Sequence, residues 1–212
     1  MTNDITQDIN KYCINHSNPE SKLLQSIREY TLMNEEMSAM ISGPIVANFL
    51  QNLIHMIHAK SVLEIGMFTG YSAMAMAEAL PDNGIVHTCE LMSPHVKTAQ
   101  NFFNQYNKNK FYIHEGDAKE TLETFSVNSF DLIFIDADKI NYIHYYKKAM
   151  MLIKNGGIIV LDNMLWGGTV LDPQTEESKT LNELNQLISN DNRNKNVLLP
   201  IRDGLMMCMC HG

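Results

Sequence analysis

Five acidic side chains recur along the chain, each at or just past the C-terminal end of a predicted strand: Glu64, Glu90, Asp117, Asp136 and Asp162. In a sheet of parallel strands, those ends line one crevice in which ligands bind. A single acid in such a position is usually a turn or capping residue. Five unpaired carboxylates along one edge would repel one another, so we expect them to face hydroxyl groups, cations or a metal ion.

A glycine turn follows the first of these strands, in the segment SVLEIGMFTGYS (61–72). Gly66 and Gly70 form the turn, and an apolar helix is predicted from Tyr71 to Leu80. A strand that passes through such a turn into a helix presents free backbone N–H groups to a ligand. We expect the missing side chains of the two glycines to let that ligand approach the main chain. The segment predicts a nucleotide-type site.

The spacing of this turn favours S-adenosylmethionine over NAD. Gly66-x-x-x-Gly70 is only part of the dinucleotide fingerprint Gly-x-Gly-x-x-Gly, and Glu64 just before it would repel a pyrophosphate. S-adenosylmethionine tolerates an acid there because it carries an ammonium group and a positive sulfur. Its carboxylate could bind the helix N-terminus and the Ser72 hydroxyl.

Acids on the next strands suit the nucleoside half of that cofactor. Glu90 ends the second strand and is placed to accept both ribose hydroxyls in charge-assisted hydrogen bonds. Asp117 and the amide of Ala118 follow the third strand and are expected near the adenine.

A second cluster consists of Asp136, Asp162 and Asn163. Two carboxylates and an amide oxygen from neighbouring strand ends suit Mg²⁺, Ca²⁺ or Mn²⁺ rather than zinc. A metal that chelates two adjacent hydroxyls would lower their pKa, and Lys139 could take the proton if the metal lowered its own pKa. The alternative interpretation is a surface lysine beside an Asp-Asn cap.

The elements that must position these residues alternate between short apolar strands and helices. A parallel, doubly wound Rossmann-like α/β sheet is therefore predicted, with strands at 62–65, 84–90, 111–114, 130–135 and 158–161. Residues 197–210 indicate two further strands around Arg202-Asp203-Gly204, as an antiparallel hairpin at the edge. We expect one domain, with a helical N-terminal cap at 1–58 and an α/β core at 61–212.

Local signals set several expected element ends. Gly43-Pro44 is expected to end one segment before a helix over 45–58. Ser93 is expected to cap a helix that has Pro94 in its first turn. A helix over 142–153 is expected to stop at Asn155-Gly156-Gly157.

Composition excludes several classes of function. The formal charge of 16 − 24 = −8 argues against a broad surface for nucleic acid or anionic membrane. No apolar run approaches the ~20 residues of a membrane span, and the N-terminus carries no secretion signal, so a cytoplasmic location is expected. Free cysteines fit that compartment. Cys208-Met-Cys210-His211 resembles a metal-binding tail, but a terminal strand is the favoured interpretation.

Four longer segments carry a family resemblance: VLEIGMFTGYSA (62–73), FIDADKINYIHYY (134–146), GGIIVLDNMLWGG (156–168) and LLPIRDGL (198–205). In order and spacing they resemble the cation-dependent O-methyltransferases of the caffeoyl-CoA and catechol type. The resemblance implies a class I methyltransferase fold with an added antiparallel strand, S-adenosylmethionine, a divalent cation and a homodimer. It also implies roles for residues. Asp136, Asp162 and Asn163 become metal ligands and Lys139 the base, while Glu64, Gly66, Ser72, Glu90 and Ala118 surround the cofactor, together with Asp117 and Asp136.

The wall of the acceptor site departs from this pattern. Residues 45–50 (IVANFL) lack the acidic or glutamine residue and the glycine that the family usually has there, so a changed acceptor preference is expected. Trp166 matches a family aromatic near the acceptor, with a core or interface side chain as the alternative. Met37 and Met40 are interpreted as flexible pocket wall or as core filler, with core favoured. Met40 is kept as a candidate acceptor contact.

The sequence therefore predicts a metal-dependent O-methyltransferase that acts on a small aromatic vicinal diol. Three alternatives stay open: an O-methyltransferase for a hydroxylated nucleobase in RNA, an NAD-dependent oxidoreductase, and a non-catalytic nucleotide-binding module. The acidic balance argues against the first, and the retained Lys139 and metal ligands argue against the last.

Overall fold

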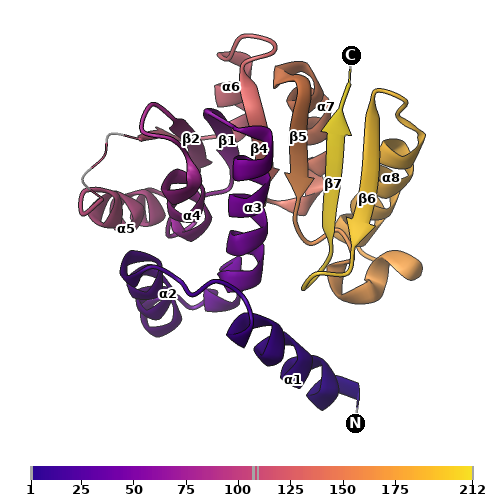
Figure 1. Cartoon of the computed structure of the whole chain (residues 1–212). Coiled ribbons are helices and arrows are strands. Elements are labelled where there is room, and N and C mark those ends of the chain that lie inside the picture. The colour runs from indigo at the N-terminus through magenta and orange to yellow at the C-terminus, as the bar shows by residue number, and fades with distance from the viewer. Residues whose placement is uncertain (1, 107, 109, 212) are drawn as a thin grey trace.

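A seven-stranded sheet in the order β3-β2-β1-β4-β5-β7-β6 forms the centre of the computed structural model, which describes residues 2–106, 108 and 110–211 (Figure 1). Strands β1 to β5 are parallel, whereas β7 runs antiparallel to both β5 and β6. The doubly wound sheet and the C-terminal antiparallel hairpin are thus confirmed. The strands are β1 Ser61–Ile65, β2 Ile85–Glu90, β3 Phe111–Glu115, β4 Phe130–Ile135, β5 Ile153–Leu161, β6 Asn194–Leu199 and β7 Leu205–Cys210.

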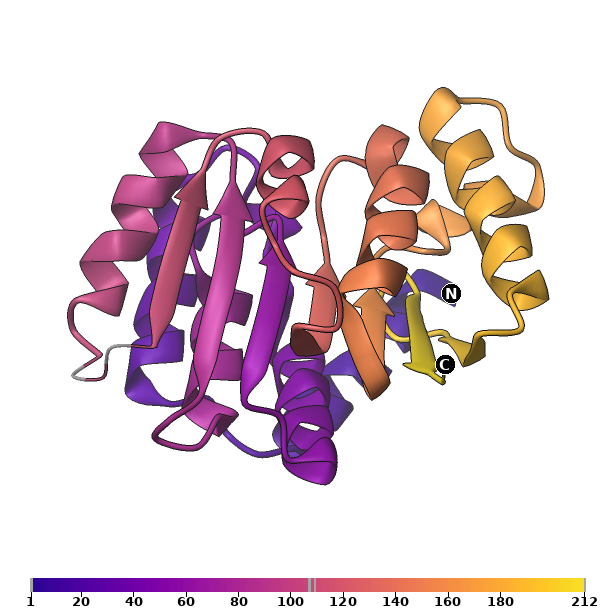
Figure 2. The same ribbon diagram turned by 90° about the horizontal axis from the view of Figure 1, so that it is seen from above.

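Helices cover both faces of the sheet (Figure 2). Successive strand residues point to opposite faces, so Val62 joins one apolar layer and Leu63 the other. The first layer contains α2 Lys22–Asn34, α3 Gly43–Ile57, α4 Tyr71–Ala79 and α5 Ser93–Phe103. The second contains α6 Ala118–Glu123, α7 Tyr142–Leu152 and α8 Glu176–Asn190. Helix α1 Thr2–Asn15 and the short 3-10 helices η1 Ser38–Met40, η2 Lys139–Asn141 and η3 Trp166–Leu171 complete the elements.

Helix α3 corrects one expectation from hydropathy. By length and composition alone, Ser38–Ile57 is apolar enough to cross a membrane, contrary to the prediction that no run reaches that length. In the fold, α3 buries Val46, Leu50 and Ile54 in the first core layer, while Asn52 and His55 are exposed. One apolar face and one polar face are typical of a helix that packs on a core.

Two glycine-containing segments also differ from expectation. Gly43-Pro44 begins α3 rather than ending the segment before it, because proline fits the first turn of a helix. Gly156 and Gly157 lie inside β5, which starts at Ile153, instead of stopping a helix in a loop. The β4–β5 register shifts there, and a side chain on Gly157 would come within 2.9 Å of the carbonyl oxygen of Asp131.

The expected cap of α5 is only partly correct. Pro94 lies in the first turn of the helix, but Met92 occupies the N-cap position. The Ser93 hydroxyl instead donates to Glu115 at the end of β3.

Candidate active site

The carboxyl ends of the parallel strands open into a cavity of about 910 Å³. Residues 39–42, which precede α3, also line it. Four of the five strand-end acids line it: Glu90, Asp117, Asp136 and Asp162. The same cavity contains Gly66, Ser72, Ala118, Lys139, Asn163, Trp166 and Met40, so the fold brings nearly all of the candidate residues together.

Glu90 is held rigidly at the end of β2. Its Oε2 accepts the backbone N–H of Phe68 and its Oε1 that of Met92, each at 2.8 Å. His95 Nδ1 lies 3.4 Å from Oε1, and its Nε2 lies 3.7 Å from Oε2 of Glu35. A carboxylate oxygen can accept more than one hydrogen bond. Glu90 therefore keeps acceptor capacity toward the cavity while its orientation is fixed.

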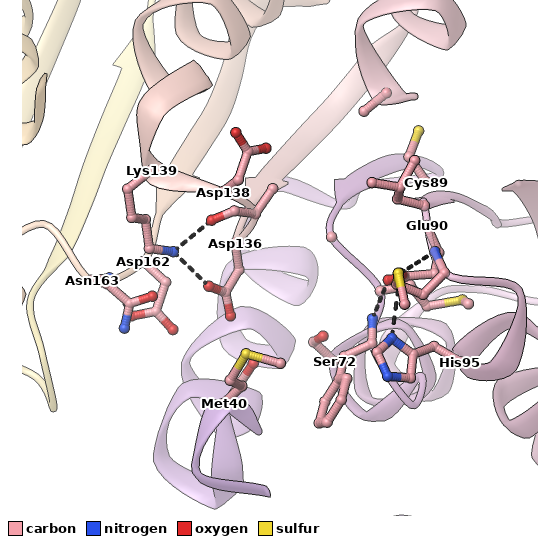
Figure 3. Close-up of a pocket in the computed structure, with 18 of the residues that line it drawn as sticks. Met40, Ser72, Cys89, Glu90, His95, Asp136, Asp138, Lys139, Asp162 and Asn163 are labelled. Atoms are coloured by element: carbon pink, nitrogen blue, oxygen red, sulfur yellow. Dashed lines mark hydrogen bonds and ion pairs between the residues drawn. The ribbon is translucent and has the colours of Figure 1, made fainter. Parts of the chain in front are cut away.

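Asp117 and Ala118 sit at the start of α6, on the same side of the cavity. Asp117 caps this helix, because its Oδ1 accepts the backbone N–H of Lys119 at 2.8 Å. Ser72 lies in the first turn of α4 and is almost fully buried. Figure 3 shows Ser72, Glu90 and His95 on one side of the cavity, across from Asp136 and Lys139.

The glycine turn has a different physical basis from the one expected. A Cβ on Gly66, at φ +96°, would stand 2.1 Å from the carbonyl oxygen of Asp136. A Cβ on Gly70, at φ +88°, would stand 2.8 Å from the ring of Phe103. Both glycines are therefore required by packing between protein segments. Gly66 still lines the cavity, but the close approach it permits is that of the β4 end to the β1 end.

Glu64 lies behind the cavity wall rather than in it. It is fully buried, and its Oε2 accepts the Thr88 hydroxyl at 2.5 Å, while Oε1 forms no hydrogen bond with any residue that the structure describes. Burial raises the pKa of Glu64 to about 8, with smaller contributions from the charges of Asp136 and Glu90. Burial therefore favours the protonated form of this carboxyl group over a wider pH range than an exposed glutamate would show.

On the opposite side, Lys139 lies beside the residues that follow β4 (Figure 3). Its Nζ donates to Asp136 Oδ1 at 3.2 Å, to the Ala137 carbonyl at 2.9 Å and to the Tyr142 hydroxyl at 2.6 Å. These three acceptors match the three N–H donors of an ammonium group. Only 8% of the Lys139 side chain is exposed, so the charge sits in a largely enclosed place.

Asp162 and Asn163 complete this side with further oxygens. Burial and the charge of Asp136 raise the pKa of Asp162 to about 7. Asn163 adopts φ +60°, a left-handed conformation that asparagine tolerates better than most residues. Within the described residues, no group of three or more His, Cys, Asp or Glu side chains could hold a metal. Two carboxylates that disfavour each other's charge, with an amide oxygen beside them, nevertheless fit a hard divalent cation with open positions for other oxygens.

Met40 and Trp166, the two candidate contacts to the acceptor, both line the cavity. Met40 is 48% exposed and Met37 is 63% exposed, so the interpretation of these methionines as core filler is wrong. The Trp166 ring lies 5.7 Å from Lys139 Nζ, measured to its centroid. Trp166 packs only partly into the second core layer.

Comparison with known proteins identifies the family. The O-methyltransferase family model matches residues 14–211. The chain belongs to the O-methyltransferase family. A probable caffeoyl-CoA O-methyltransferase 1 of Dictyostelium discoideum is 32% identical over 92% of this chain and 89% of its own. A catechol O-methyltransferase domain-containing protein 1 of Mus musculus is 34% identical over 93% of this chain and 78% of its own.

A solved structure agrees with this assignment. The SAH-bound methyltransferase of Podospora anserina has a TM-score of 0.92 and 25% identity, covering 100% of this chain and 97% of the other. The resemblance to the caffeoyl-CoA and catechol type is confirmed, and with it the prediction of an S-adenosylmethionine-dependent O-methyltransferase.

Three residues of this O-methyltransferase were not predicted from the sequence to be functional: His95 and Arg202, which line the cavity, and Tyr142, which lies next to it. The Tyr142 hydroxyl, besides accepting from Lys139, lies 3.3 Å from the Ile135 carbonyl and 3.1 Å from the Asp162 carbonyl, so it ties β4 to β5. Its spacing of three residues from Lys139 could have indicated it. His95 reaches the cavity from the first turn of α5 and Arg202 from the turn between β6 and β7, and no local sequence pattern marks either residue.

Proposed function

We propose that this O-methyltransferase moves the methyl group of S-adenosylmethionine to one hydroxyl of a small aromatic vicinal diol, with a divalent cation, Mg²⁺ by preference, beside the acceptor. The observation that carries the proposal is the meeting of Asp136, Asp162, Asn163 and Lys139 in one cavity with Glu90. That cavity, of about 910 Å³, is large for a single-ligand pocket and has room for a donor and an acceptor.

The donor side is formed by the first three strand ends. We assign the ribose hydroxyls to Glu90, the adenine region to Asp117 and Ala118, and the methionine carboxylate to Ser72 at the start of α4. The fixed carboxylate of Glu90 supports this assignment, because charge-assisted bonds to hydroxyls are strongest when the acceptor is already oriented. The SAH-bound relative supports the same donor.

The acceptor side is formed by the ends of β4 and β5. Relatives named for caffeoyl-CoA and catechol support an aromatic diol, and we assign its ring to the wall that contains Trp166 and Met40. Asp136, Asp162 and Asn163 would hold the cation. When bound, that cation lowers the pKa of the diol hydroxyls.

In the proposed reaction, Lys139 Nζ takes the proton of the reacting hydroxyl. The oxygen then attacks the sulfonium methyl in line, which yields a methyl ether and S-adenosylhomocysteine. Since the donor is already activated, positioning of the two reactants supplies much of the acceleration. The Lys139 ammonium group donates to three neighbouring oxygens, so Nζ must first give up one proton to solvent, and with it one of these bonds, before it can accept the proton of the hydroxyl.

The metal assignment predicts the behaviour of Asp162→Ala. Turnover of a catechol with labelled S-adenosylmethionine and Mg²⁺ should fall by at least roughly 100-fold, because several kcal/mol of charge stabilisation are lost. Calorimetry should show donor affinity changed by less than about threefold, since Asp162 lies on the acceptor side.

Asp172→Ala, at an exposed position outside the cavity, is the matched control and should keep full turnover. Wild-type turnover that survives a strong chelator would contradict the metal assignment. A methyl mass shift in digested RNA, with no methylated catechol, would favour the nucleobase alternative instead.

The homodimer and the cytoplasmic location stay predictions from the resemblance and the free cysteines.

A further inference from the structure

Strained backbone gathers around the cavity and draws attention to Arg202. Six non-glycine residues of the described chain have positive φ: His58, Phe68, Asn128, Asn163, Trp166 and Arg202. Four of them line the cavity, namely Phe68, Asn163, Trp166 and Arg202. Such conformations cost free energy, persist where the surrounding structure holds them, and are more frequent at functional sites. Arginine at φ +51°, in a turn between two strands where glycine would be unstrained, is the least expected of the four.

The Arg202 side chain is fixed on one side only. Its Nη1 donates to the carbonyl of Ile41 at 2.6 Å and to the carbonyl of Ser42. These carbonyls belong to the segment 39–42, which also lines the cavity. A guanidinium has five N–H donors, and among the described residues no acceptor is bonded to Nε or Nη2. The Nε–Nη2 edge, which suits bidentate binding of a carboxylate, is therefore free.

The turn that contains Arg202 packs directly on the loop with the acceptor residues. The N–H of Met164 donates to the Gly204 carbonyl at 3.0 Å, and that of Leu165 to the Asp203 carbonyl at 2.8 Å. Asp203 also accepts the N–H of Gly167 at 2.5 Å. Arg202 thus stands next to the loop that runs from Asp162 to Trp166, on the acceptor side.

Among the positively charged residues described in the cavity lining, Arg202 is the one on the acceptor side that has free hydrogen-bond donors. Lysine and arginine line it at three positions only, within the described chain: Lys119, Lys139 and Arg202. Lys139 donates to three oxygens, and Lys119 lies 3.6 Å from Asp117 on the donor side. The remaining charged lining is acidic and would repel an anion: Glu90, Asp117, Asp136, Asp138, Asp162 and Glu177.

We propose that Arg202 binds an anionic group of the acceptor, so that the preferred substrate is an aromatic vicinal diol with an acidic substituent. This inference rests on the proposed function. The diol end meets Asp136, Asp162 and Asn163, the ring lies against Trp166, and the acidic end meets the free edge of the guanidinium. Either a carboxylate on a small acid or a phosphate on a larger ester supplies that charge.

The test compares two acceptors that differ in charge and by one methyl group, caffeate and its neutral methyl ester. Wild type, Arg202→Gly and Arg202→Lys are assayed for kcat/KM with labelled S-adenosylmethionine and Mg²⁺. Glycine relieves the positive-φ strain, so this variant should fold, and thermal unfolding checks that it does. The preference for caffeate over the ester should fall by roughly 10- to 100-fold in Arg202→Gly, mainly through KM, which is the loss expected for a charged hydrogen bond. Arg202→Lys should recover part of it.

Caffeoyl-CoA forms a third arm that separates the two sources of charge. A loss confined to caffeoyl-CoA supports the anion subsite with a phosphate as its ligand, and a loss confined to caffeate supports a carboxylate. Equal losses on every acceptor, the neutral ester included, would overturn the inference, since Arg202 would then only hold residues 41–42 in place. Wild type that methylates none of these diols would instead reject the proposed function.

Discussion

At the scale of single residues, the strand-end acids divide into two kinds according to what they contact. Glu90 and Asp117 accept backbone N–H groups, which hold their carboxylates in a fixed orientation. Asp136 instead forms an ion pair with Lys139, and its negative charge raises the pKa of the neighbouring Asp162. The first arrangement suits hydroxyl groups of a nucleoside, and the second suits a cation. One edge of the sheet therefore presents two chemically different groups of carboxylates side by side.

Glu90→Ala tests the first arrangement. Removing the carboxylate should weaken S-adenosylmethionine binding by roughly 1–3 kcal/mol, the usual cost of losing hydrogen bonds to a charged group. Calorimetry with the purified protein measures this directly. Glu115→Ala, at the end of β3 and outside the cavity, is the matched control. Equal affinities of wild type and Glu90→Ala would remove the ribose assignment.

The sequence could predict a functional residue only where an acidic side chain stands at the end of a predicted parallel strand. Glu90, Asp136 and Asp162 are such cases, because parallel strands must place their ends at one edge. Met40 could not be placed, since a methionine before a helix is equally suited to core and to wall. The role of Arg202 could not be predicted either, because its partners at residues 41–42 lie 161 and 160 positions away in the chain.

At the scale of elements, the β1–α4 turn depends on how closely the ends of β1 and β4 meet. Gly66→Ala should bring a methyl group to 2.1 Å from the Asp136 carbonyl, in addition to the cost of φ +96°. We expect a loss of at least about 2 kcal/mol in the free energy of unfolding, measured with urea. Donor binding and turnover should fall as well, because Asp136 must shift.

Gly156→Ala separates the two causes. Gly156 has φ +80°, but no atom of the described residues lies within 4 Å of an added Cβ, and Gly156 does not line the cavity. This control should therefore show the conformational cost of about 1 kcal/mol alone. Similar destabilisation in both variants would contradict the packing role of Gly66.

The same turn shows where element prediction succeeds and where it stops. Strand, turn and helix over 61–79 were all predictable, since apolar runs and glycines mark them locally. The reason for the glycines was not predictable, because it lies in residues 103 and 136, which are distant in sequence. The glycine pair in β5 misled for the same reason, since the neighbouring strand decides that a bulge forms there.

At the scale of the whole molecule, an acidic group buried beneath the site lowers the free energy of unfolding at high pH when no cofactor is bound. Glu64 is buried beneath the cavity and near the charges of Asp136 and Glu90. Ionising such a group without a cation nearby is unfavourable. A cofactor with an ammonium group and a sulfonium would offset that cost, so folding and donor binding should be coupled through pH.

Glu64→Gln measures this coupling. The folded pKa of Glu64, about 8, lies above the ordinary value of 4.5, so the folded state keeps a proton that the unfolded state has lost between these two pH values. Stability from this group is therefore fully present below pH 4.5 and declines as pH rises through 8. Glutamine at this position cannot ionise, and the other titrating groups near it, Asp136 and Glu90 among them, are present in both proteins.

Urea unfolding of the ligand-free proteins at pH 6 and pH 9 should show Glu64→Gln gaining roughly 2 kcal/mol relative to wild type over that interval. With saturating S-adenosylmethionine the difference should shrink, because the bound positive charges lower the pKa of Glu64 toward its ordinary value. A constant difference across pH would mean that Glu64 is already ionised in the folded state. In that case the buried carboxylate must have a cationic partner in the protein itself, and the proposed coupling to the donor would not exist.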